Sequence, residues 1–169
     1  GLSLPMMSHG YEVQMTPMQI LTFYNAVANN GRMVKPRFVT EIRSNGNTIK
    51  SFGQEVIVNS IASGSTIRKA REMMEGVVEH GTAMNLRSAD YKIAGKTGTA
   101  QIAKDKHGYR QGARISYQAS FVGYFPADNP LYSCIVVVNA PSNGVYYGNL
   151  VAGTVFREIA DKIYATSFF

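Results

Sequence analysis

The sequence predicts one α+β domain in which helices pack against an antiparallel sheet. Segments with helical and strand periodicity follow in the order helix, hairpin, helix, three strands, helix. Apolar residues make up 45% of the 169 residues, which is enough for a hydrophobic core. Only the short turn 126–130 separates the last two predicted strands, so these two strands are expected to form an antiparallel hairpin.

The first predicted helix begins at a capping box. In Thr16-Pro17-Met18-Gln19, threonine and glutamine are three residues apart and proline stands at the first helical position. Apolar residues follow at helical spacing, and Asn29-Asn30-Gly31 is typical of a left-handed helix end. Residues 1–12 are expected to form an irregular lead-in.

Two further helices are predicted from the same kind of pattern. One begins at Ser63 or Ser65 and ends at His80-Gly81, with its paired methionines at core spacing. The other spans Leu150 to Ala165 and would cover a sheet with one apolar face. That face consists of Val151, Ala152, Val155, Phe156, Ile159, Ala160 and Ile163.

A surface hairpin is predicted between the first two helices. Pro36 to Arg43 and Thr48 to Phe52 are β-rich runs, and the Asn-Gly pair between them is the strongest short signal for a tight turn. Val56 to Val58 adds a brief strand. This part of the chain carries no pattern of chemical groups and is expected to be structural.

Three strands are predicted in the second half of the chain. The first lies within residues 91–102, the second spans Tyr117 to Phe125, and the third spans Leu131 to Asn139. A polar, basic loop from Ala103 to Ser116 joins the first two and is long enough to form a rim or a lid.

Composition and charge argue against several classes of function. The net charge is +6, but the 17 lysines and arginines are scattered and no helix carries a basic stripe, so nucleic acid is not an expected partner.

Cys134 has no second cysteine to pair with and lies in an apolar strand, where a thiol behaves as a small hydrophobe. The histidines lack the spacing of metal ligands, so neither a metal nor another cofactor is expected. No apolar run approaches the ~18 residues needed to cross a bilayer. The densest basic group lies in the loop and consists of Lys104, Lys106, Arg110 and Arg114 around His107.

The stretch that carries chemical groups is Ala94-Gly95-Lys96-Thr97-Gly98-Thr99-Ala100. A lysine, two hydroxyls and two glycines are poor core material, and strand glycines indicate that a backbone or a ligand approaches closely. The alternative is a bulge in a solvated strand. A phosphate-binding loop is not expected, because that motif needs a glycine where Asp90 stands and a helix directly afterwards.

Taken together, several stretches resemble the C-terminal part of a class B penicillin-binding protein transpeptidase domain, the type used in cell division and elongation. They are Gly10–Gln19 with the helix end Ala28–Gly31, the Lys-Thr-Gly strand Ala94–Gln101, Ala119–Pro126, and Tyr147-Gly148. The resemblance implies the α+β fold shared by penicillin-binding protein transpeptidases and serine β-lactamases. Residues 1–169 would be the C-terminal portion of a single such domain, with the N-terminal part of the fold missing.

The resemblance also implies roles for four residues of this strand. The hydroxyls of Thr97 and Thr99 would bind the terminal carboxylate of a D-Ala-D-Ala stem peptide or of a β-lactam, and the Thr99 backbone N–H would be one oxyanion donor. Lys96 would add positive charge there and hold the hydroxyl of a Ser-x-Asn element, while Gly98 leaves room for close approach. Because strand side chains alternate, one cleft can use Lys96 and both threonines only if it lies at the sheet edge or the strand twists sharply.

The chain departs from the family pattern in one respect. No serine has lysine three residues later or asparagine two residues later, and the nearest match is Ser88-Ala89-Asp90. In the family both elements precede the stretch at Gly10, so the chain is expected to lack its nucleophile and to be inactive alone. The whole protein would be a serine-type D,D-transpeptidase that cross-links peptidoglycan. The alternatives are a β-lactamase or carboxypeptidase, and a non-catalytic binding or scaffold domain of the same fold.

Further expectations concern the surroundings of the domain. The family implies an anchor in the cell inner membrane outside this chain, a periplasmic domain, and cell-wall synthesis or division proteins as partners. The three predicted strands would leave an exposed edge and an uncovered apolar face, which favour self-association.

Overall fold

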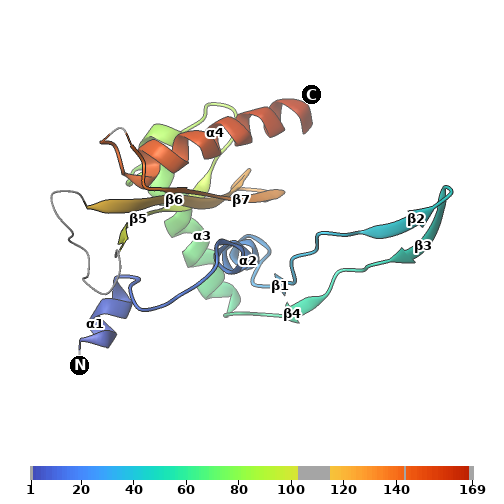
Figure 1. The fold of residues 1–169 in the computed structure, drawn as a ribbon. Helices are drawn as coiled ribbons and strands as arrows, with labels where there is room; N and C mark the ends of the chain where they lie inside the picture. The colour runs from blue at the N-terminus through green and yellow to red at the C-terminus, as the bar shows by residue number, and fades with distance from the viewer. Residues whose placement is uncertain (1, 103–114, 143, 168–169) are drawn as a thin grey trace.

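The computed structural model describes residues 2–102, 115–142 and 144–167, and its centre is a three-stranded antiparallel sheet. β5 (Ala94–Ile102), β6 (Ser116–Phe125) and β7 (Tyr132–Asn139) lie in this order across the sheet (Figure 1). The α+β class and the predicted hairpin of the last two strands are therefore confirmed. Residues 103–114, which make up most of the predicted basic loop, lie outside the described residues.

Helices cover both faces of this sheet. α4 (Gly148–Ser167) lies on one face, and α2 (Pro17–Ala28) and α3 (Gly64–Glu79) lie on the other, as Figure 1 shows. On the α4 face, Phe156 makes edge-to-face contacts with Phe121 and Phe125, with ring centroids 4.8 and 5.7 Å apart. On the opposite face, Tyr124 is buried against α2 and α3. The sheet is thus the middle of three layers, with a core on each side, so the predicted uncovered apolar face is wrong.

The predicted helix ends are confirmed. The hydroxyl of Thr16 accepts a hydrogen bond from the Gln19 N–H at 3.2 Å, and the Gln19 side chain accepts one from the Thr16 N–H at 2.8 Å. Asn30 and Gly31, with φ of 54° and 90°, end α2 in the left-handed region. Ser63 caps α3, which settles the choice between the two candidate serines.

The predicted surface hairpin is present and projects away from the sheet (Figure 1). β2 (Glu41–Ser44) and β3 (Asn47–Ser51) pair through the Asn45-Gly46 turn, whose two residues have φ of 49° and 81°. The predicted start at Pro36 is wrong, because the strand begins at Glu41 and, among the described residues, only one backbone hydrogen bond, from the Phe52 N–H to the Thr40 carbonyl at 2.9 Å, extends the pairing beyond it. The brief strand β4 (Val56–Val58) is confirmed, and it pairs with the unpredicted β1 (Met33–Val34).

Three details of the sequence analysis are wrong. Residues 3–8 form a short helix, α1 (Ser3–Ser8), because the Met6 N–H bonds to the Leu2 carbonyl at 3.1 Å and Pro5 is tolerated in a first turn. Met73 on α3 is 68% exposed, whereas Met74 packs against the sheet. Val155 on α4 is 42% exposed. Both misplaced side chains lie one residue, or about 100° of helix rotation, before a residue that faces the sheet.

Candidate active site

β5 carries the four predicted site residues and forms one edge of the sheet. β6 pairs with one side of β5, from Ala94 opposite Tyr124 to Ile102 opposite Ser116, and no described strand pairs with its other side. Lys96 and Thr99 are exposed, whereas their neighbours 97 and 98 are half-buried. The free side of β5 can therefore accept an extended chain as an additional strand.

The edge brings together side chains that belong to opposite faces of the sheet. Thr97 is opposite Phe121, which packs against α4, so the Thr97 side chain lies on the α4 face and that of Lys96 on the other. The Lys96 Nζ nevertheless donates to the Thr97 carbonyl at 2.9 Å and lies 3.4 Å from the Thr97 hydroxyl. The lysine side chain thus bends around the free edge and carries its charge to the threonine side.

Both threonine hydroxyls have a fixed partner behind them. The Gly148 N–H, at the start of α4, donates to the Thr99 Oγ1 at 3.1 Å. The hydroxyl of Thr82 lies 3.1 Å from the Thr97 Oγ1. Because an N–H group can only donate, the Thr99 oxygen is the acceptor and its own proton is left for another acceptor. A carboxylate, which accepts hydrogen bonds and carries a negative charge, is the ligand that suits these protons and the lysine.

The glycines of β5 are explained first by contacts within the protein. A Cβ on Gly95 would lie 2.5 Å from the Val122 carbonyl, and a Cβ on Gly98 would lie 2.4 Å from the Ser120 hydroxyl. The close approach expected at strand glycines is therefore made by β6 at both positions. Contact between Gly98 and a substrate stays a prediction.

The sequence analysis missed the residues that support this edge. Thr82 follows α3, and Asn85 belongs to the short 3-10 helix η1 (Met84–Leu86). Asn85 and Asn149 exchange two hydrogen bonds of 3.0 Å, one from each side-chain amide, which fasten η1 to the first turn of α4. Asn85 and Asn149 are 64 residues apart in sequence, and no local pattern signals that they meet. The only sequence signal near Thr82 is the predicted helix end at His80-Gly81, directly before it.

Ser88, the nearest match to a family serine, lies away from this edge. Its hydroxyl accepts a hydrogen bond from the Asp90 N–H at 3.3 Å and so closes a local turn. The Asp90 carbonyl accepts from the Tyr164 hydroxyl at 3.1 Å, in the last turns of α4. Since the Thr99 hydroxyl contacts the first residue of the same helix, the length of α4 separates Ser88 from the predicted site.

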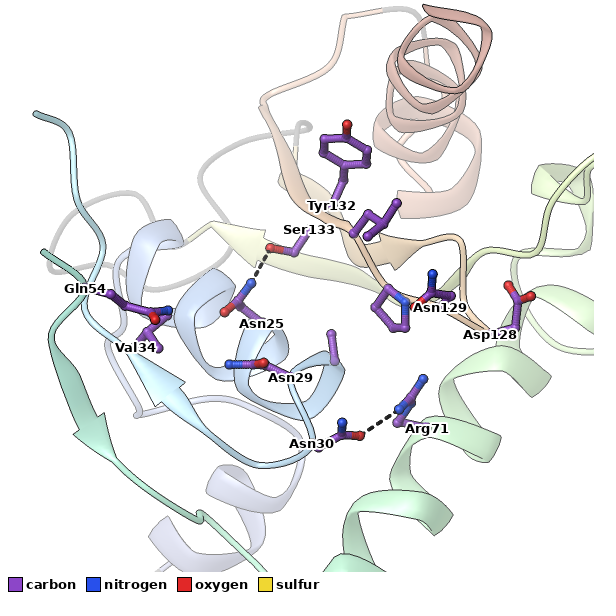
Figure 2. Close-up of a pocket in the computed structure, with 13 residues that line it drawn as sticks. Asn25, Asn29, Asn30, Val34, Gln54, Arg71, Asp128, Asn129, Tyr132 and Ser133 are labelled. Atoms are coloured by element: carbon purple, nitrogen blue, oxygen red, sulfur yellow. Dashed lines mark hydrogen bonds between the residues drawn. The ribbon is translucent and has the colours of Figure 1, made fainter. Parts of the chain in front are cut away.

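A polar pocket of about 430 Å³ lies elsewhere, between α2, α3 and the turn from β6 to β7 (Figure 2). Arg71 donates to the Asn30 side chain at 2.9 Å and to the Ala127 carbonyl at 3.0 Å, and the Asn25 amide donates to the Ser133 hydroxyl at 3.0 Å. These bonds fasten both helices to the β6–β7 hairpin. None of the four predicted site residues lines this pocket.

Other reactive groups in the described ranges do not form a second centre. Cys134 is half-buried, less than predicted, and burial raises the pKa of its thiol, which leaves little thiolate for attack. No cluster of three histidine, cysteine or acidic side chains occurs there in an arrangement that suits a metal ion. Among the helices described, none is both long enough and apolar enough to cross a membrane.

Fold and site together define a class: an α+β domain whose edge strand presents a lysine and two threonine hydroxyls beside the first turn of its last helix. Residues 2–161 match the family model described as "Penicillin binding protein transpeptidase domain". The chain therefore belongs to the penicillin-binding protein transpeptidase family, which confirms the predicted family and fold.

Relatives and solved structures agree with this assignment. The peptidoglycan D,D-transpeptidase FtsI homolog of Mesostigma viride is 29% identical over 168 residues, which cover 92% of this chain and 28% of that protein. The apo transpeptidase domain of Burkholderia pseudomallei penicillin-binding protein 3 superposes with a TM-score of 0.71 at 30% identity, over 96% of this chain and 46% of that one. Penicillin-binding protein 3 of Mycobacterium tuberculosis, complexed with aztreonam, gives a TM-score of 0.76 at 27% identity, over 93% and 36% respectively. The chain thus spans between about a quarter and about a half of these proteins.

Proposed function

We propose that this chain forms the carboxylate-binding side of the active site of a serine-type D,D-transpeptidase that cross-links peptidoglycan. The observation that carries the proposal is the convergence of the Lys96 ammonium group and the hydroxyls of Thr97 and Thr99 at the free edge of β5. Membership of the family supports it.

The proposed substrate is a stem peptide that ends in D-Ala-D-Ala. Its terminal carboxylate would accept hydrogen bonds from Thr97 and Thr99 beside the Lys96 charge, and its backbone would pair with the free side of β5. The Thr97 carbonyl points to the free edge, because it accepts a hydrogen bond from Lys96 there. Backbone groups two residues apart in a strand point to the same side, so the Thr99 backbone also faces the free edge. The Thr99 N–H would then face the scissile carbonyl as one oxyanion donor, a contribution of roughly 3 to 4 kcal/mol to the barrier in other acyl transferases.

The reaction proposed for the whole protein is a two-step acyl transfer. A serine oxygen attacks the carbonyl between the two D-Ala residues, the C–N bond breaks, and the terminal D-Ala leaves with a proton. The amine of a second stem peptide then attacks the ester, which releases the serine and forms the cross-link. A β-lactam would react as in the first step, with the serine oxygen attacking the carbonyl of its ring amide. The aztreonam complex of the Mycobacterium tuberculosis relative supports this ligand class.

We propose that the nucleophile lies outside these residues and that the chain is inactive without it. None of its serines has the lysine or asparagine spacing of the family's two serine elements.

The proposed location is the periplasmic side of the cell inner membrane, with cell-wall synthesis or division proteins as partners. The free edge of β5 and the exposed apolar side chains of α1 and the hairpin support self-association of the isolated chain. Analytical ultracentrifugation measures this, and a monomer at all concentrations would contradict it.

Labelling with a fluorescent penicillin tests the proposed function. The native-length protein that contains these residues should form a stable covalent adduct on a serine outside them, and the 169-residue chain alone should form none. Lys96→Ala should slow labelling of the native-length protein. The control Lys50→Ala removes an equivalent charge from the projecting hairpin, where Lys50 lies over the Phe52 ring, and should leave labelling unchanged.

Each alternative function has its own outcome in the same experiment. An adduct on the 169-residue chain would show that its nucleophile is present after all. A native-length protein that takes up no label would be a binding or scaffold domain. Label that is taken up and lost by hydrolysis within minutes would indicate a β-lactamase or carboxypeptidase.

A further inference from the structure

Thr82 places a hydroxyl directly behind the proposed carboxylate site. Its Oγ1 lies 3.1 Å from the Thr97 Oγ1, although the two residues are 15 positions apart and belong to different elements. Within the described residues, Thr97 is the partner found for this hydroxyl. The contact therefore links the end of α3 to the edge strand at the position where the ligand would bind.

The backbone on either side of Thr82 is held in place. A Cβ on Gly81 would lie 2.8 Å from the Val77 Cα, so this glycine packs directly on the last turn of α3. The Ala83 N–H donates to the Val77 carbonyl at 2.9 Å, and Ala83 is fully buried. Between two such neighbours, the Thr82 backbone has a fixed position relative to β5. The Thr82 side chain is exposed, and its backbone is the part that this packing holds beside β5.

The hydrogen-bonding capacity of Thr97 shows what this partner does. A threonine hydroxyl has one proton to donate and two lone pairs that accept. The Lys96 ammonium group, which can only donate, lies 3.4 Å from one side of the Thr97 oxygen. If Thr82 donates to the remaining lone pair, the Thr97 proton is free for a ligand. If Thr82 accepts instead, it takes that proton away from the ligand.

We propose that Thr82 is a positioning residue that donates its hydroxyl proton to Thr97 when a carboxylate is bound, and so turns the Thr97 proton toward that carboxylate. The proposal rests on the proposed function of the β5 edge. Thr99 gives an internal parallel, because the Gly148 N–H occupies its oxygen and leaves its proton free in the same way. Both hydroxyls that face the carboxylate would then have a donor behind them.

The test compares two β-lactam ligands that differ only in the carboxylate. Acylation rates of the native-length protein are measured with benzylpenicillin and with its methyl ester, in which the negative charge is absent. Thr82→Val, which keeps the shape and removes the hydroxyl, should lower the rate with the free acid about 3- to 10-fold relative to the ester. Thr82→Ser, which keeps the hydroxyl, should lose much less. Thr48→Val is the matched control, because its hydroxyl donates to Glu41 on the projecting hairpin.

Four outcomes overturn the positioning role. An equal fall in both rates for Thr82→Val would show a structural effect, and a lowered melting temperature of that variant would confirm this. Unchanged rates would show that the hydroxyl is not used. A Thr82→Ser variant as slow as Thr82→Val would show that a hydroxyl at this position does not by itself preserve the rate. A wild-type protein that no β-lactam acylates would refute the proposed function itself, and the role of Thr82 with it.

Discussion

Replacing Gly148 by alanine tests whether the first turn of α4 is pressed onto the edge strand. An added Cβ would lie 2.5 Å from the carbonyl oxygens of Gly98 and Ser120 and 3.1 Å from the Gly98 nitrogen. Ordinary contacts begin at 3.4 Å, so the start of α4 would have to move away from the sheet by about 1 Å. All three obstructing atoms belong to backbone that is paired in the sheet and cannot rotate aside.

The size of the effect follows from two contributions. Overpacking at a rigid site costs about 1 to 3 kcal/mol of the free energy of unfolding. The same movement breaks the hydrogen bond from the Gly148 N–H to the Thr99 hydroxyl, which adds about 0.5 to 1.5 kcal/mol. We therefore expect Gly148→Ala to lower the free energy of unfolding by about 1.5 to 4.5 kcal/mol. Acylation of the native-length protein should also slow, because Thr99 loses the donor behind it.

Two other glycines give matched controls. A Cβ on Gly153, also in α4, would lie 2.9 and 3.2 Å from the Leu86 methyl groups and 3.5 Å from the Gly148 carbonyl oxygen, so its close contacts are with side-chain ends rather than with backbone. We expect Gly153→Ala to cost less than about 1 kcal/mol. A Cβ on Gly64 at the start of α3 would meet nothing within 4 Å, so Gly64→Ala should be neutral or stabilising by up to about 1 kcal/mol.

Urea denaturation followed by circular dichroism measures this series at one pH and temperature. The expected order of destabilisation is Gly148→Ala, then Gly153→Ala, then Gly64→Ala. If Gly148→Ala were as stable as Gly64→Ala, α4 would not rest on the β5 backbone. The hydrogen bond from the Gly148 N–H to the Thr99 hydroxyl, which depends on that contact, would then be refuted as well.

Three further predictions concern stability and reactivity. Thr16→Ala removes the capping box with Gln19 and should lower the free energy of unfolding by about 1 kcal/mol in urea denaturation. Tyr91→Phe removes the 2.7 Å bond to Asp161 and should cost about 0.5 to 1.5 kcal/mol at neutral pH. Burial and Asp161 raise the Tyr91 pKa above its ordinary value of 10.0. The contribution of Tyr91 to the free energy of unfolding is therefore complete below pH 10 and is lost as the pH rises above it. Tyr91→Phe has no such group, so its stability should fall less over the same pH range. Burial also raises the Cys134 pKa, so iodoacetamide should alkylate the folded chain at least about 10-fold more slowly than the unfolded chain.

Each of these has a contrary result. A Thr16→Ala variant with unchanged stability would show that the cap does not hold α2. Wild type and Tyr91→Phe that lose stability equally between pH 9 and 11 would show that Tyr91 ionises as easily in the folded chain as in the unfolded one. Equal alkylation rates in folded and unfolded chains would place Cys134 at the surface.

Local sequence signals predicted most of the framework. Helix ends are set by neighbours in sequence, so the Thr16 capping box was found and the second cap was narrowed to Ser63 or Ser65; in both helices a side chain accepts from a backbone N–H three residues away. The Asn45-Gly46 turn was found because few residues other than Asn and Gly adopt positive φ readily. Where burial depends on which neighbour covers a helix, as for Met73 and Val155, periodicity alone misplaced the side chain.

By itself, then, the sequence determined most of the elements, the family and the strand that carries Lys96, Thr97, Gly98 and Thr99, because each is encoded by residues adjacent in the chain. The tertiary structure alone decided that this strand is an edge, since an edge is defined by the absence of a partner strand on one side within the described residues. It also decided which groups stand behind the two hydroxyls. Thr82 and Gly148 reach Thr97 and Thr99 across gaps of 15 and 49 residues, and only packing of α3 and α4 onto the sheet brings them within hydrogen-bonding distance.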